Sequence, residues 1–194
     1  MTTPESLPIS LILSLEQTSA TPPTMRLTVT NTSDTETYTL LTWSSPLDPL
    51  ALALGLVTVA IPSPDNEKST VPFPIPQIML RRVMPPPMDA FVTLSPGESA
   101  SNEVVFRDPV VDMAALVDAA AGSAADPGNV KVFVSAGNDE DEDGGVVVWK
   151  GKRKENLMAA QIESLGRDDE SVVKWKPRKI WVDMGLLAIP PSHQ

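Results

Sequence analysis

Apolar and polar residues alternate in short runs along most of the chain. In the clearest run, residues 25–30, Met25, Leu27 and Val29 fall on one face and polar side chains on the other. A period of two is typical of a strand with one buried face. Similar runs, rich in β-branched and other apolar residues, predict further strands at residues 7–15, 37–43, 57–61, 90–94, 104–106, 130–134, 146–149 and 180–182.

Leucine recurs at every second position between residues 50 and 56, with Ala51, Ala53 and Gly55 between the leucines. Large side chains on one face and small ones on the other indicate a strand with another part of the chain packed closely against its second face. We therefore expect a strand here, which continues or restarts at Val57.

Residues 71–88 are rich in proline. Pro72, Pro74 and Pro76 occupy alternate positions, and three more prolines follow at residues 85–87. Because proline has no backbone N–H, such a segment can pair on one side only. We place it at the edge of a sheet.

Helix signals are few. Asp108 suits an N-cap, Pro109 suits the first helical position and Gly122 suits a stop, so we expect a helix between them. A second short helix is expected at residues 154–165. Many short strands with little helix predict an all-β sandwich.

The composition restricts the chemistry. The chain has no cysteine, and its only histidine is His193. Ser-His-Asp catalysis, Cys-His catalysis and zinc sites need those side chains. The net charge of −10 argues against nucleic-acid binding, which needs cations on the protein. We therefore expect neither an enzyme nor a cofactor. A glycosidase with two acids facing a cleft is the minor alternative.

The longest apolar run, residues 50–61, is shorter than the roughly 20 residues of a membrane helix. The N-terminus lacks the basic start of a secretory signal. We therefore expect no membrane association and a cytoplasmic protein, with secretion left open. If the chain is secreted, the sequon at Asn31 becomes relevant to glycosylation.

A series of short motifs follows a definite order between residues 7 and 137. They are Leu27 to Asn31, Leu40-Leu41, Pro46-Leu47-Asp48, Val57 with Val59, Val71-Pro72-Phe73, Arg81-Arg82, Asp89 to Ser99, and Val132 to Gly137. This order resembles the N-terminal prodomain of fungal deuterolysin-type metalloproteases. The resemblance implies an immunoglobulin-like antiparallel β-sandwich with one or two short helices, which binds protein by covering or folding a protease. The protease's own His-Glu-x-x-His helix is absent, so no catalytic residue is carried over.

On this basis residues 1–137 form a sandwich core resembling a prodomain. Residues 138–194 form a C-terminal extension that adds a hairpin, a short helix and a strand to the same domain. Lys152-Arg153 in the extension resembles a dibasic processing site, although a solvated basic turn beside the acidic run is the simpler interpretation.

Five consecutive acids precede Gly144. Asp139, Asp141 and Asp143 match ligand positions of a calcium loop, but Lys150 stands where the closing glutamate belongs. We expect an exposed loop between two paired strands, without useful metal affinity.

Aromatic and basic residues also gather near the C-terminus. A face of this kind suits single-stranded nucleic acid or sugars, but core indoles with solvated cationic neighbours are the simpler interpretation. The residues concerned are Trp149, Trp175 and Trp181, with Lys174, Lys176, Arg178 and Lys179.

The function that these patterns favour is a non-enzymatic protein-interaction module. A sheet edge offers unpaired backbone groups, so the proline-rich edge is the expected contact surface. The expected partner is another protein, either a protease or a second copy of the chain in a homodimer. The expected contact residues are Val71, Phe73, Ile75, Ile78, Met79, Arg81, Arg82, Met84 and Met88.

Overall fold

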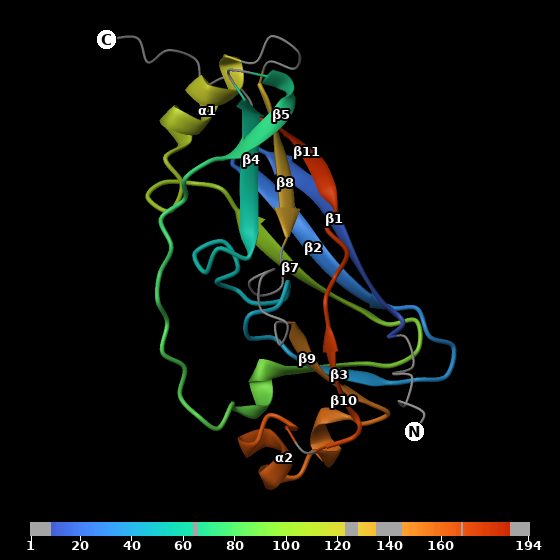
Figure 1. The fold of residues 1–194 in the computed structure, drawn as a ribbon. Helices are drawn as coiled ribbons and strands as arrows, with labels where there is room; N and C mark the ends of the chain where they lie inside the picture. Colours follow the sequence, from blue (N-terminus) through green and yellow to red (C-terminus); the bar gives the residue numbers. More distant parts are fainter. Residues whose placement is uncertain (1–8, 64–65, 123–127, 135–144, 168, 187–194) are drawn as a thin grey trace.

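The computed structural model describes residues 9–63, 66–122, 128–134, 145–167 and 169–186. The acidic run at residues 139–143 and His193 lie outside these ranges. Within them the chain is mostly β-structure, arranged as two packed layers (Figure 1). The all-β sandwich is therefore confirmed.

The first layer is one antiparallel sheet in the order β1-β2-β7. Its strands are β1 (Leu11–Ala20), β2 (Pro23–Asn31) and β7 (Ser99–Val105). The predicted alternation holds in β2, since Met25, Leu27 and Val29 are fully buried. Opposite them, Thr28 and Thr30 bond the hydroxyls of β7 on the outer face.

The second layer consists of two four-stranded sheets, one above the other in Figure 1. The lower sheet has the order β10-β9-β3-β6, and the upper sheet has the order β11-β8-β4-β5. The two orders correspond strand by strand: β10 matches β11, β9 matches β8, β3 matches β4 and β6 matches β5. Each matching pair consists of two strands that follow each other in the sequence. These strands are β3 (Tyr38–Leu41), β4 (Val57–Ser63), β5 (Asn66–Pro72), β6 (Phe91–Leu94), β8 (Asn129–Val134), β9 (Val146–Lys150), β10 (Val172–Trp175) and β11 (Trp181–Gly185).

One side-chain contact joins the layers along the side formed by β1 and β11. The Gln17 amide nitrogen donates to the Gly185 carbonyl at 2.9 Å, and the Gly185 N–H donates to the Gln17 amide oxygen at 2.9 Å. The Gln17 side chain therefore donates and accepts one hydrogen bond each, as the backbone of a neighbouring strand would. We call this contact the Gln17 clasp.

The core lies between the layers and is aliphatic. Leu27, Leu40, Val59 and Val132 are fully buried there. A smaller cluster at the lower end is built around Trp149, whose ring meets Phe91 edge-on at 5.5 Å between centroids. Short helical segments cover the ends of the sandwich: η1 (Met88–Ala90), α1 (Met113–Ala121), η2 (Lys154–Asn156) and α2 (Ala159–Glu163).

The first helix begins later than the sequence predicts. Its N-cap is Asp112, whose side chain accepts the Ala115 N–H at 2.9 Å. Asp108 only reaches the Met113 N–H at 3.4 Å, from a turn that places Val111 in the core. Two aspartates compete for one helix start, and the one with the better spacing caps it.

The prediction of a strand at residues 50–56 is wrong. Leu54 and Leu56 donate their N–H groups to Leu50 and Ala51, so the segment is a series of turns. These local bonds satisfy the backbone without a partner strand. The strand begins only at Val57. The small residues correctly indicated that another segment packs closely here, because Gln77 lies against Gly55.

Candidate functional site

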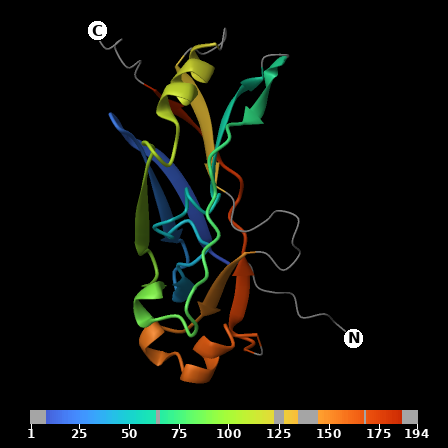
Figure 2. The same cartoon turned by 90° about the vertical axis from the view of Figure 1, so that its left-hand side faces the viewer.

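Residues 71–88, here called the proline strap, run along one side of the sandwich. β5 is the edge strand of the upper sheet and ends at Pro72, earlier than expected. From Phe73 to Pro87 the chain has no regular secondary structure. Figure 2, which looks onto this side, shows it descending from β5 to η1.

Exposed apolar side chains concentrate on the proline strap. Of the twelve large hydrophobic residues that are exposed in the described ranges, seven lie within these residues. Met79 is exposed as fully as in an extended peptide, and Val83 is 82% exposed. The others are Val71, Ile78, Leu80, Met84 and Met88.

Three contacts hold the strap to the body. Phe73 is buried, and its N–H donates to the Val59 carbonyl at 2.7 Å. The Ile78 N–H donates to the Ala53 carbonyl at 2.9 Å. Arg82 forms an ion pair with Asp48. The strap is thus held at several points, and most side chains between these points face solvent, although Ile75 is partly buried against the core.

Arg82 is held by an aromatic ring as well as by a carboxylate. Its guanidinium lies 5.0 Å from the centre of the Trp43 ring, a favourable arrangement for a cation. Asp48 is fully buried and also accepts the N–H groups of Ser44 at 2.9 Å and Leu50 at 3.0 Å. A carboxylate with these donors is satisfied as an anion in the interior.

A glycine allows the strap to pack closely. Gly55 has a φ of +76°, and a β-carbon there would lie 2.4 Å from the amide nitrogen of Gln77. A larger residue would be strained by its backbone and would displace the Gln77 side chain.

The expected contact residues therefore divide into two groups. Phe73, Ile75 and Arg82 pack against the body and hold the strap. The remaining expected residues are exposed: Val71, Ile78, Met79, Arg81, Met84 and Met88. Sequence reasoning did not identify Leu80 and Val83, although both are apolar residues within the same segment, nor Asp48 as the anchor of Arg82.

The dibasic pair Lys152-Arg153 lies in a structured turn. The Lys152 ammonium lies 2.9 Å from Asp169, and its carbonyl accepts the Thr39 hydroxyl at 2.7 Å. Arg153 is exposed and lies 3.9 Å from Glu155. Processing here would first require release of the Lys152 contacts.

The tryptophans do not form one surface. Trp149 and Trp175 are buried, whereas Trp181 is 44% exposed and packs on Phe133 with 4.3 Å between ring centres. Lys179 lies over the Phe133 ring at 4.4 Å. The candidate calcium ligands Asp139, Asp141 and Asp143 lie outside the described residues. The strands on either side of them, β8 and β9, belong to different sheets, so the expectation that these two strands pair is wrong. Within those ranges no three His, Cys, Asp or Glu side chains are placed to share a metal, and no helix is long and apolar enough to cross a bilayer.

Comparison with known proteins identifies the sandwich. A family model of immunoglobulin-like domains matches residues 10–140, which is more than half of the chain. The chain belongs to the immunoglobulin-like domain family. The match ends before β9, β10 and β11, although these strands complete the second layer of the domain.

The domain is also similar to a protein from the fungus Arthroderma benhamiae that is named an uncharacterized secreted protein. The two are 34% identical over 83 residues, which cover 43% of this chain and 39% of the relative. The chain therefore aligns with less than half of that protein. The immunoglobulin-like part of the prodomain resemblance is confirmed, and the specific likeness to deuterolysin remains a prediction.

Proposed function

We propose that this immunoglobulin-like domain is a non-enzymatic interaction module that binds a partner protein through the proline strap. The observation that carries the proposal is the concentration of exposed apolar side chains between Val71 and Met88. Soluble proteins seldom leave such a group together on the surface unless it binds something.

The strap is prepared for binding in two ways. Its prolines and its contacts at Phe73 and Arg82 restrict the unbound chain, so less conformational entropy is lost when a partner binds. Its methionines adapt their shape to an irregular apolar surface. The exposed Arg81 favours a partner with an acidic group beside that surface.

The partner class that we propose is a protease. The support is the resemblance to deuterolysin prodomains, whose motifs Pro46-Leu47-Asp48 and Arg81-Arg82 supply the ion pair that fixes the strap. Binding there would cover the protease as an inhibitor does. We also propose that the protein is secreted, because the Arthroderma relative is named as secreted. The expected cytoplasmic location has no support from that relative.

The test uses the double variant Met79→Ser/Val83→Ser and the control Met158→Ser, which changes an exposed methionine far along the chain from the strap. A purified fungal deuterolysin-type protease is assayed with each protein. We expect inhibition by the wild type and by the control, and at least a tenfold weaker effect with the double variant. Equal inhibition by all three proteins, or none by the wild type, rejects the protease proposal.

Self-association is the alternative, and the edge strand β5 favours it because its outer backbone groups can pair with a second copy. Light scattering over a range of concentrations tests it. A dimer that forms in the wild type and persists in the double variant, whose changes lie outside β5, would replace the protease proposal with a homodimer.

A further inference from the structure

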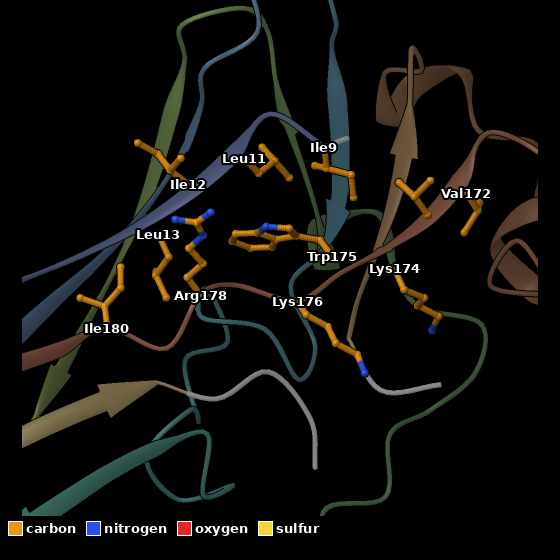
Figure 3. Close-up of a pocket in the computed structure, with 11 residues that line it drawn as sticks. Ile9, Leu11, Ile12, Leu13, Val172, Lys174, Trp175, Lys176, Arg178 and Ile180 are labelled. Atoms are coloured by element: carbon orange, nitrogen blue, oxygen red, sulfur yellow. The ribbon is translucent and has the colours of Figure 1, made fainter. Parts of the chain in front are cut away.

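A groove opens on the side of the sandwich where β1 faces β10 and the segment that leads to β11. The clasp joins β1 to β11 near the upper end of this side. Below it, residues 176–180 interrupt the strand structure between β10 and β11. A cavity of about 790 Å³ lies between this interruption and the start of β1. We call it the edge groove (Figure 3).

Eight of the eleven residues that line the edge groove are hydrophobic, and the other three are cationic. Leu11 and Leu13 come from β1 and Trp175 from the end of β10, and all three are at least nine-tenths buried. Ile9 and Ile180 extend the same lining. The volume falls within the range of roughly 300–1,000 Å³ that is usual for small-molecule sites.

The charge of the groove is opposite to that of the chain. Among the residues that the structure describes, its lining contains three cations and no acid, in a protein with a net charge of −10. In Figure 3 Arg178 points toward β1 beside the Trp175 indole, whereas Lys174 and Lys176 point away from it. Within the described residues no carboxylate pairs with Arg178.

These features define the chemistry of a ligand. A guanidinium binds a carboxylate through two parallel hydrogen bonds, and the apolar walls favour a hydrocarbon body. We propose that the edge groove binds a free amphipathic carboxylate, with its head on Arg178 and its apolar part along Leu11, Leu13 and Trp175. The site is separate from the proline strap and does not depend on the function proposed for it.

The experiment is calorimetric titration of the whole chain with sodium decanoate, below the concentration at which decanoate aggregates. We expect saturable binding at one site, with acetate failing to bind because it lacks the apolar part. Arg178→Glu should weaken binding at least tenfold, and Arg178→Lys should have an intermediate effect because it keeps the charge and loses the paired geometry.

The controls are Arg107→Glu, the same charge change at an exposed arginine outside the groove, and the strap variant Met79→Ser/Val83→Ser. Both should bind decanoate as the wild type does, and thermal melting should show all variants folded. Absence of saturable binding to the wild type overturns the proposal, as does equal weakening by Arg107→Glu. Arg178-dependent binding to phosphatidylserine vesicles without binding of free decanoate would assign the groove to a membrane surface instead.

Discussion

Asp169 shows how one carboxylate can stabilise a turn. The Ser171 hydroxyl donates to it at 2.7 Å, and the Lys152 ammonium lies 2.9 Å away. The hydrogen bond from Ser171, with a further contribution from Lys152, lowers the pKa of Asp169 from 3.8 to about 2 against the opposing effect of burial. The ionised group accepts these hydrogen bonds more strongly than the protonated group does, so ionisation of Asp169 favours the folded state.

The stabilisation by Asp169 should depend on pH. It is fully present above the unfolded pKa of about 4 and is lost as the pH falls through about 2. We expect Asp169→Asn to lower the free energy of unfolding by roughly 1–2 kcal/mol at pH 7 and by almost nothing at pH 2. Urea unfolding at several pH values measures this. A difference that is the same at both pH values would contradict the assignment.

Asn31 should carry no glycan in the folded protein. Its side chain is fully buried, and its amide nitrogen donates to the carbonyls of Glu36 at 2.7 Å and Leu94 at 3.0 Å. A sugar would replace one of the two hydrogens on that nitrogen, so at least one of these bonds would break, and the sugar would have to be placed in the interior. Protein secreted from a glycosylating host should therefore show an unchanged mass after endoglycosidase treatment. Asn31→Ala should cost roughly 2–4 kcal/mol because buried partners are left unsatisfied.

At the scale of elements, the start of α1 can be tested by comparing two aspartates. Asp112 caps the helix, whereas the contact from Asp108 is too long to be a strong hydrogen bond. Asp112→Ala should destabilise the protein by about 1 kcal/mol, and Asp108→Ala should have a smaller effect. Thermal melts of both variants measure the difference, and the reverse order would mean that the helix start is misplaced.

The elements also show what the sequence can predict. Alternation in residues 25–30 identifies β2 because one face of that strand is buried along its length. The leucines of residues 50–56 have the same period, but local turn hydrogen bonds determine their structure. The prolines predicted an edge strand over residues 71–88, but the edge strand β5 ends at Pro72 and residues 73–87 leave the sheet. The anchors of the strap could not be predicted, because Asp48 and Arg82 lie 34 residues apart and meet only in the fold.

The edge groove could be predicted only in part. The alternation of Trp175 with Lys174 and Lys176 is visible in the sequence and indicates an aromatic residue between cations. The wall formed by Leu11 and Leu13 is distant in sequence and depends on how the two layers meet. The sequence therefore suggested the basic side of the groove without its apolar wall.

At the scale of the molecule, we expect the strands after the family match to be required for folding. β9 lies between β10 and β3, and Trp149, Trp175 and Met184 are buried. A chain that ends at residue 144 loses these side chains from the core. We expect it to show no cooperative thermal transition by circular dichroism. A sharp transition near that of the full chain would show that residues 1–144 fold independently.

The division of the second layer has a mechanical consequence. The first layer has continuous strands of 10, 9 and 7 residues, whereas each position across the second layer is divided between two strands of four to seven residues. Under tension along the strands, the continuous sheet should carry most of the load, because its long ladders must break together. The two halves of the second layer would then separate at lower force. The domain would extend in two steps in a single-molecule pulling experiment. The proline strap links β5 in one half of the second layer to β6 in the other, so it would extend in the first of these steps.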